Sequence, residues 1–332
     1  MKILISMLGG IGDTLMLSMV AKRIKDIYPS CDIVASVRKD KLIVLDGNPH
    51  ISKVIVREVF SDLPVFSKKY DAIIDLKYVA KTYYTGDQFD FDSPAEEIIR
   101  RQKEFELELY VTDLPFYRMR TWQDSLQRIY DNDSLSIGKE NMNWYSILSY
   151  FSGLNLSTKD LYISKEEVKD IPSDFIAVSS PPVHKLAKHW RPDFWNKVFE
   201  SFPEETFVLL GIMTNRMLQG KNVIHKELSF NIRQTADVIS KSKFLISEEG
   251  GLVHVAKAVD KKAIVLFGPT QKWFFGYKDN VNLKESFNEC HYCHNKHPFW
   301  EKRCLGGKSP YCTILQKMTP DVVIEEIKKC LT

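Results

Sequence analysis

Apolar residues follow two different periods along this chain, and segments with the two periods alternate. Short apolar runs are typical of strands buried in a parallel sheet. In the first half these runs are 2–7, 32–37, 53–56 and 72–76, and a short helix is expected at 39–46. Between the first two runs, apolar positions from Thr14 to Tyr28 recur at helical spacing, and Pro29 lies just beyond them. This β-α-β order predicts a parallel, doubly wound sheet.

A second β-α series occupies the other half. Its expected strands are 175–179, 206–211, 244–247 and 263–267, and its expected helices are 191–202, 232–241 and 252–259. Thr319 and Pro320 then open a final helix, because Thr is a good N-cap and Pro is favoured at the first helical position. The pattern therefore predicts an α/β protein with two similar halves, which suits a chain of 332 residues.

Composition places the boundary between the halves. The charged stretch from Ser164 to Ser173 contains Pro172 and is the expected linker. We expect an N-terminal Rossmann-like domain at 1–165, a C-terminal one at 174–318, and a last helix at 319–332. Ligands of doubly wound folds bind outside the C-terminal ends of the strands, so a ligand cleft is expected where the two domains face each other.

Residues 80–135 interrupt the α/β order. They combine many charged residues with aromatic ones: Tyr83, Tyr84, Phe89, Phe91, Tyr110, Phe116, Tyr117 and Trp122. Two interpretations stay open. The aromatic side chains form irregular packing over the sheet edge, or the segment recognises an acceptor, because functional variability concentrates in such loops.

Charge and hydropathy narrow the functional classes. A net charge of +3 is small and does not indicate a nucleic-acid binder. The apolar start of the chain is too short for a signal peptide core or a membrane span, and no run of 18 apolar residues occurs. We therefore expect a cytoplasmic protein, with peripheral association at the inner face of a membrane compatible with the sequence.

A cysteine cluster near the end of the chain indicates a metal. In a reducing compartment, clustered thiols favour metal binding over disulfides. A C-x2-C pair directs two thiolates at one ion from a single turn, and two more complete a tetrahedral shell that suits zinc or iron. Neutral His291, His294 or His297 could replace one sulfur, and unmetallated thiols are the alternative. The expected structural finger spans 288–314 and its ligands are Cys290, Cys293, Cys304 and Cys312.

The first of two glycine turns joins the first strand to the first helix. It reads Gly9-Gly10-Ile11-Gly12-Asp13 and matches neither a Walker loop nor a G-x-G-x-x-G motif. Its glycines allow close approach of a ligand to the backbone. Asp13 stands where a helix N-cap is expected, so it either caps the helix or serves as a general base for a hydroxyl.

The second turn is read together with a lysine motif upstream. Lys188-His189-Trp190 precedes one helix, and the stretch from Glu249 to His254 joins a strand to another. Backbone N–H groups at that helix start suit a diphosphate, and Lys188 would add positive charge there. The alternatives are a solvated lysine and a histidine that faces the sheet.

Taken in this order, the motifs resemble glycosyltransferase family 9, the ADP-heptose:lipopolysaccharide heptosyltransferase family. The resemblance covers most of the chain. It rests on GGIGDTLMLSMVAKRIKDIYP, GNPHISKVIV, KHWRPDFW, EEGGLVHVAKAV and VLFGPT. It implies a GT-B fold, with two Rossmann-like domains that face a cleft and a C-terminal helix that packs back on the N-terminal domain. The cysteine segment is similar to the four-cysteine iron-binding finger of the heptosyltransferases that modify autotransporter proteins.

The resemblance also implies roles for individual residues. Asp13 would be the catalytic base, Gly12 of the same turn would contact the donor, and Lys188 would contact the donor phosphates. The second turn would contact diphosphate and sugar through Glu249, Gly250, Gly251, Leu252 and His254.

Three departures from the family pattern leave the donor open. Glu249 replaces an aspartate and Gly250 replaces a hydroxyl residue. The acid often found for the ribose after the strand ending at Gly211 is absent, with Thr214 and Asn215 in that place.

The resulting expectation is a sugar transfer that inverts the anomeric centre and needs no metal for catalysis. The donor would be a nucleotide-diphosphate sugar, heptose-like, and the acceptor a surface glycan or a protein. The alternative is a catalytically silent module that binds a nucleotide or carbohydrate. A nucleic-acid binder that uses the finger is disfavoured, because acidic Glu289 and Glu301 accompany its basic residues.

Overall fold

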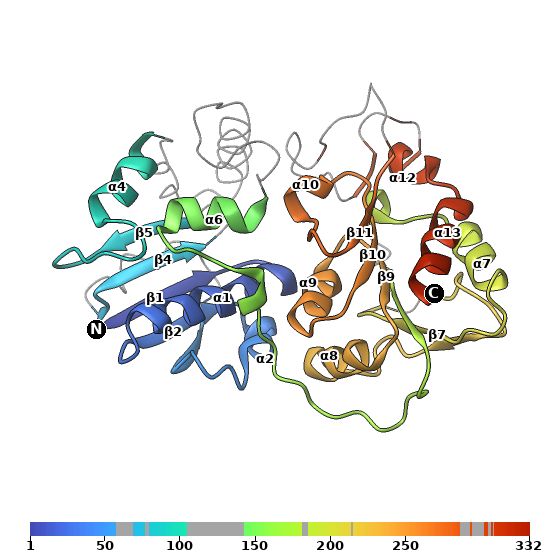
Figure 1. Cartoon of the computed structure of the whole chain (residues 1–332), viewed down its shortest axis with the longest axis horizontal. Coiled ribbons are helices and arrows are strands. Elements are labelled where there is room, and N and C mark those ends of the chain that lie inside the picture. The colour runs from blue at the N-terminus through green and yellow to red at the C-terminus, as the bar shows by residue number, and fades with distance from the viewer. Residues whose placement is uncertain are drawn as a thin grey trace. The chain divides into compact units, whose positions relative to one another are not determined.

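The computed structural model describes residues 1–57, 69–76, 80–104, 143–180, 185–213, 215–285, 293, 302–304, 307 and 309–332. The chain divides into two compact units, Met1–Ser164 and Lys165–Thr332, each built around its own sheet (Figure 1). None of the helices among these residues is long and apolar enough to cross a lipid bilayer.

The sheet of the first unit has the order β3-β2-β1-β4-β5 in the described residues. Its parallel strands are β1 (Lys2–Met7), β2 (Asp32–Val37), β3 (Lys53–Val56) and β4 (Ala72–Leu76), all at the expected positions. The fifth strand, β5 (Ala80–Tyr84), was not expected and runs antiparallel to β4. Three residues between β4 and β5 permit only that direction, because a parallel crossover needs about a dozen.

The helices of the first unit differ from expectation in detail. Helix α1 (Ile11–Ile27) begins three residues before Thr14, and the expected helix at 39–46 is a short η1 (Lys39–Lys41) followed by α2 (Leu42–Leu45). The remaining elements are α4 (Ala95–Glu104), α6 (Trp144–Ser152) and η6 (Thr158–Asp160). Asn143 caps α6 through its side chain, and Gly153 ends it in the left-handed region at φ 70°.

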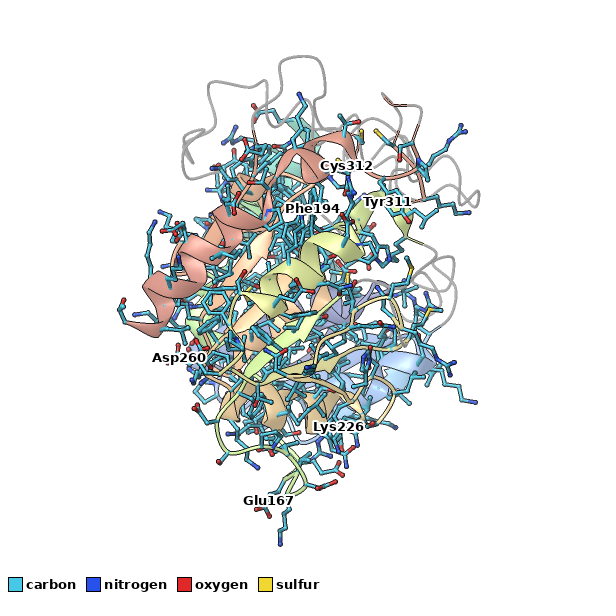
Figure 2. All side chains as sticks on the ribbon, turned by 90° about the vertical axis from the view of Figure 1, so that its right-hand side faces the viewer. Glu167, Phe194, Lys226, Asp260, Tyr311 and Cys312 are labelled. Carbon is cyan, nitrogen blue, oxygen red and sulfur yellow. The ribbon has the colours of Figure 1, made fainter. Side chains whose placement is uncertain are left out.

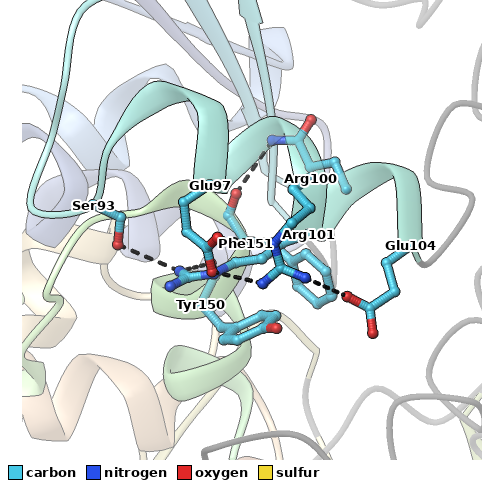
Figure 3. Close-up of polar contacts among 8 residues, drawn as sticks. Ser93, Glu97, Arg100, Arg101, Glu104, Tyr150 and Phe151 are labelled. Atoms are coloured by element: carbon cyan, nitrogen blue, oxygen red, sulfur yellow. Dashed lines mark hydrogen bonds and ion pairs between the residues drawn. The ribbon is translucent and has the colours of Figure 1, made fainter.

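A polar network holds α4 against α6 (Figure 3). Glu97 accepts hydrogen bonds from both Arg100 and Arg101, which lower its pKa to about 2. Arg101 also donates to the Tyr150 carbonyl at 2.9 Å and lies over the Tyr150 ring, and Gln102 donates to the Phe151 carbonyl. The network therefore stays ionised at neutral pH and fixes the described part of the 80–135 segment.

The described aromatic residues of that segment pack against one another. Phe89 makes edge contacts with Tyr28, Tyr84 and Phe91, at ring-centroid distances of 5.2 to 5.9 Å. Packing is thus the structural role of these rings. The aromatic residues after position 104 and the acceptor role suggested for them lie outside the described residues.

The second unit contains a six-stranded parallel sheet of order β11-β10-β9-β6-β7-β8. Its strands are β6 (Ile176–Ser179), β7 (Phe207–Leu210), β8 (Val223–His225), β9 (Leu245–Glu248), β10 (Ala263–Leu266) and β11 (Val281–Leu283). Counted along the chain this is the 3-2-1-4-5-6 order of a doubly wound nucleotide-binding sheet. The predicted α/β fold with parallel sheets is confirmed. The edge strands β8 and β11 were not expected, because strands of three residues are too short to recognise in the sequence.

The helices of this unit follow the predicted order. The expected ones are α7 (Pro192–Glu200), α8 (Ile232–Lys241), α9 (Gly251–Ala258) and α13 (Pro320–Leu331). Three short ones were not expected: η7 (Leu186–Lys188), α10 (Lys272–Phe275) and α12 (Thr313–Lys317). Figure 1 shows α7 and α13 side by side on one face of the sheet, with α8 and α9 on the other.

The last helix contributes to the core of the second unit. Buried Val323 and Ile327 of α13 join this core together with Trp195 and Phe199 of α7. Side chains fill the layers of this unit, with Phe194 and Cys312 near one end and Glu167 at the other (Figure 2). The packing of α13 on the N-terminal domain stays a prediction.

Candidate functional site

The second sheet reverses its order between β6 and β9, which are neighbours although β7 and β8 follow β6 in sequence. At such a topological switch point, the connections that leave the two strands diverge and provide a ligand site. Lys188 lies in the connection after β6, and Glu249 follows β9 directly. The fold thus brings both motifs of the second half to the same switch point.

An internal ion pair joins these two motifs. The Lys188 Nζ lies 2.7 Å from Glu249 Oε2, and each side chain is only 9% exposed. Thr270, just after β10, donates its hydroxyl to the same carboxylate oxygen at 3.0 Å. Burial alone would raise the pKa of Glu249, but the Lys188 charge and the hydrogen bonds from Lys188 and Thr270 lower it. Glu249 is therefore a carboxylate that orients Lys188.

Helix α9 begins directly after this pair. The Val253 N–H donates to the Gly250 carbonyl at 3.1 Å. The N–H groups before it have no carbonyl partner within a helix, and the helix dipole adds positive potential there, so the start of α9 suits an anion. Gly250, the N-cap, has an extended backbone with φ 176°, and a Cβ there would meet only the Glu248 carbonyl oxygen, at 3.8 Å. The backbone thus accepts a side chain at this position.

His254 lies in the second turn of α9 and is 5% exposed. Its Nδ1 is 2.6 Å from the hydroxyl of Tyr277, which is buried as well. Burial lowers the pKa of His254 to about 4, so the imidazole is neutral at pH 7. It contributes a hydrogen-bonding group rather than a positive charge.

The sequence motifs had indicated no role for Glu248, which is 1% exposed. Its Oε1 accepts hydrogen bonds from the Trp190 backbone N–H at 3.0 Å and from the Trp195 Nε1 at 3.3 Å. Burial raises the pKa of Glu248 to about 7. One signal in the sequence could have revealed its burial. Side chains alternate between the two faces of a strand, so Glu248 shares the face of the core residue Ile246.

The same upstream segment is tied to the end of the chain. The Gln316 side chain of α12 donates to the His189 carbonyl at 2.6 Å, and the Trp190 indole donates to the Met318 carbonyl at 2.9 Å. Helix α12 therefore fixes the residues next to Lys188, and it starts directly after Cys312.

A carboxylate from the segment after β8 contacts the loop after β7, which the sequence did not indicate. Glu227, which follows β8, accepts a hydrogen bond from the Asn215 backbone N–H at 3.2 Å and lies 3.1 Å from His225 Nδ1. Ile212, next to Gly211, is 64% exposed. Thr214 lies outside the described residues. An acid thus reaches this loop from a neighbouring strand, which local sequence order could not reveal.

In the first unit, the Gly9–Asp13 turn follows β1, again at a strand-order reversal, between β1 and β4. Gly10, not Asp13, is the N-cap of α1. Asp13 is the third residue of the helix, and its Oδ2 accepts a hydrogen bond from the Gly10 N–H. Asp13 is partly exposed and Gly12 is buried. The expected N-cap position is wrong, because the helix starts at Ile11, although the carboxylate still satisfies a backbone donor at the helix start.

We expect Gly9→Ala to damage this turn. A Cβ at Gly9 would collide with the Asp13 side chain, whereas a Cβ at Gly86 would have no heavy atom within 4 Å. Overpacking of this kind costs about 1–3 kcal/mol. Urea unfolding should show that loss for Gly9→Ala and less than about 0.5 kcal/mol for the control Gly86→Ala. Equal stabilities would contradict the described geometry of the turn.

A buried polar cluster lies at the same end of the first sheet. Arg57, directly after β3 and 2% exposed, donates from Nη1 to the Ser6 hydroxyl at 2.8 Å. The Ser6 and Ser36 hydroxyl oxygens are 3.4 Å apart across β1 and β2. Guanidinium stays charged in proteins, so Arg57 brings positive charge to the strand ends. No sequence motif had indicated Ser6, Ser36 or Arg57.

The cysteine finger is described only in part. Cys290 lies outside the described residues, as do His291, His294 and His297. Cys304 and Cys312 are buried, and Cys304 Sγ lies 3.5 Å from the hydroxyl of Thr313, the residue after Cys312. Within the described residues no group of three or more potential ligands is close enough to hold a metal. The four-thiolate finger therefore stays a prediction.

Comparison with known families gives a match for residues 149–303. These residues, just under half of the chain, match glycosyltransferase family 9 (heptosyltransferase). They include the Lys188 motif and the Glu249–His254 turn. A comparison with curated protein sequences finds no match.

Solved structures share the fold over the whole chain. A family 9 glycosyl transferase from Veillonella parvula has a TM-score of 0.62 at 15% identity, over 99% of this chain and 97% of that one. The E. coli ADP-heptose LPS heptosyltransferase II gives 0.57 at 16% identity, over 100% and 98%. The iron-containing dodecameric glycosyltransferase TibC from enterotoxigenic E. coli gives 0.64 at 11% identity, over 99% and 78%.

Identities this low show a shared fold and leave substrates open. The enzyme class rests on the family match, which covers the residues that form the ion pair and the start of α9. From this match and the shared fold, the protein is a glycosyltransferase.

Proposed function

We propose that the protein transfers a heptose-like sugar from a nucleotide-diphosphate donor to a hydroxyl group of a surface glycan or a protein, with inversion at the anomeric carbon. The observation that carries the proposal is the buried Lys188–Glu249 pair beside the start of α9, at the switch point of a nucleotide-binding sheet. A cytoplasmic location, at the inner face of a membrane, is part of the proposal.

The donor diphosphate lies against the first turn of α9. The N–H groups of Gly250, Gly251 and Leu252 donate to its oxygens, and Lys188 supplies the positive charge. Glu249 holds Lys188 in place, which reduces the loss of side-chain freedom on binding. His254, neutral at pH 7, offers a hydrogen bond without adding charge.

Asp13 is the general base on the first unit. The acceptor oxygen attacks the anomeric carbon as Asp13 takes the hydroxyl proton, and the bond from that carbon to the diphosphate breaks. The leaving nucleoside diphosphate gains negative charge, which the start of α9 and Lys188 stabilise. The Gly10 N–H bond to Asp13 orients the carboxylate.

Ligands of the structural relatives suggest the first donor to test. TibC has been solved in complex with ADP-D-β-D-heptose, and the E. coli heptosyltransferase WaaC with ADP. ADP-heptose is therefore the proposed donor for this chain.

Four thiolates of the finger would hold zinc or iron in a structural role. The proposed ligands are Cys290, Cys293, Cys304 and Cys312, and four protein ligands leave no open position for substrate. The metal would stabilise the chain around the start of α12, whose Gln316 holds the His189 carbonyl.

Thermal unfolding in the presence of ADP-heptose, ADP-glucose, UDP-glucose and GDP-mannose tests the proposal. We expect ADP-heptose to raise the melting temperature most, because a ligand of the native state stabilises it. Mass spectrometry of the same mixtures should then show donor hydrolysis or transfer. Stabilisation without turnover would contradict the proposed transfer from that donor, and no stabilisation by any of the four would contradict donor binding.

A further inference from the structure

Glu248 is a carboxyl group on a face of the sheet that is otherwise apolar. It is the last residue of β9, and its side chain lies on the same face as Ile246, with Leu266 as its register partner on β10. Both neighbours belong to the apolar core under α7 and α13. Burying a carboxyl group costs free energy unless its hydrogen bonds compensate, so its contacts should show a role.

One oxygen of this carboxyl group connects two elements. Oε1 accepts from the Trp190 backbone N–H at 3.0 Å and from the Trp195 indole at 3.3 Å. Trp190 lies two residues after Lys188, and Trp195 is on α7. Oε2 is buried without a hydrogen-bond partner among the described residues. The carboxyl group therefore ties the Lys188 segment and α7 to the end of β9.

Two consecutive carboxyl groups thus hold the two ends of one three-residue segment. Glu249 binds the Lys188 ammonium, and Glu248 binds the Trp190 backbone. We propose that Glu248 is the positioning residue of the donor site, which keeps Lys188 beside the first turn of α9. This inference rests on the proposed function, because it assigns Glu248 to the donor site proposed above.

The charge of Glu248 gives this role a signature that a purely structural carboxyl would lack. The ionisable groups on the adjoining segments are Lys188, His189, Glu249, His254, Arg191 and Asp193, and of these Lys188 acts on the charge of Glu248. Arg191 and Asp193 pair with each other at the surface, 2.7 Å apart. Because burial raises the pKa of Glu248 to about 7, the group gains its charge near neutral pH. That negative charge opposes a diphosphate held by Lys188.

Hydrogen exchange tests the tether without any ligand. Glu248→Leu removes both acceptor contacts at similar volume, whereas Glu248→Gln keeps one oxygen as acceptor. We expect the Trp190 amide to exchange at least about tenfold faster in Glu248→Leu than in wild type, and Glu248→Gln to stay within about threefold. The control is Asp237→Asn. Asp237 is another buried carboxyl group of this unit and accepts a hydrogen bond from the Val168 N–H at 2.9 Å, so this variant should change exchange at Val168 and not at Trp190. Unchanged exchange at Trp190 in Glu248→Leu would overturn the proposal.

Binding of ADP-heptose, measured by calorimetry from pH 5.5 to 8.5, tests the link to the donor site. Its diphosphate is a diester and does not titrate in this range. Wild type and Asp237→Asn should lose about tenfold in affinity as the pH rises through about 7. Glu248→Gln should lose that step, and Glu248→Leu should bind more weakly than Glu248→Gln at pH 6.

The possible failures of the two proposals are distinguishable. A wild-type protein that binds no ADP-heptose contradicts the proposed donor, and exchange at Trp190 still decides whether Glu248 is a tether. A wild-type affinity step that persists in Glu248→Gln contradicts the role of Glu248 and leaves the proposed function intact.

Discussion

Replacing Asp13 with alanine is expected to lower the turnover number of sugar transfer by about 10²–10⁴-fold, because the acceptor hydroxyl loses its general base. Donor affinity should stay within about twofold of wild type, since the proposed diphosphate contacts lie on the second unit. The measurement is steady-state transfer from ADP-heptose, with donor affinity from calorimetry.

A second helix offers the control for this variant. Gln234 occupies the same third position of α8 and likewise accepts a hydrogen bond from the N-cap N–H, that of Asn231, at 3.0 Å. Gln234→Ala should cost about 1 kcal/mol of stability, as Asp13→Ala should, without loss of turnover. If both variants keep full turnover, Asp13 is a helix-capping residue and the proposed base is wrong.

Replacing Lys188 with methionine is expected to lower the free energy of unfolding by about 3 kcal/mol, because Glu249 remains buried without its cation. Donor affinity should fall as well, by about tenfold or more, since the diphosphate loses a charged partner. Urea unfolding, monitored by tryptophan fluorescence, measures the change in stability. Calorimetry with ADP-heptose measures the change in donor affinity.

The double variant Lys188→Met/Glu249→Gln separates stability from binding. Removing both charges should restore most of the stability and none of the affinity. Lys241→Met, which breaks the pair with Asp237 at 2.7 Å, is the control, because Lys241 is 39% exposed and such pairs contribute about 1 kcal/mol or less. Restored donor affinity in the double variant would show that Lys188 does not contact the donor.

Much of the fold followed from local patterns. Buried strands of four apolar residues, such as β7 and β10, carry their own signal, and Pro192 and Pro320 mark the first residues of their helices. The three-residue strands β8 and β11 carry almost none. The start of α1 was misplaced because Gly10 makes no side-chain cap that a sequence pattern would reveal.

The candidate site shows the same limit. Lys188 and Glu249 were found through motifs, but their ion pair joins segments about 60 residues apart, so only the strand order brings them together. Glu248 was missed because its partners are a backbone N–H and an indole, groups that leave no charge pattern in sequence. The contribution of α13 to the core of the second unit was not foreseen, because an amphipathic helix does not specify which core it completes.

A crystal structure of the protein with bound ADP-heptose tests the central claim most directly. The account predicts that the diphosphate oxygens lie within hydrogen-bonding distance of the Gly250 and Gly251 N–H groups and of Lys188 Nζ. A diphosphate bound away from the start of α9, with Lys188 paired only to Glu249, would contradict it.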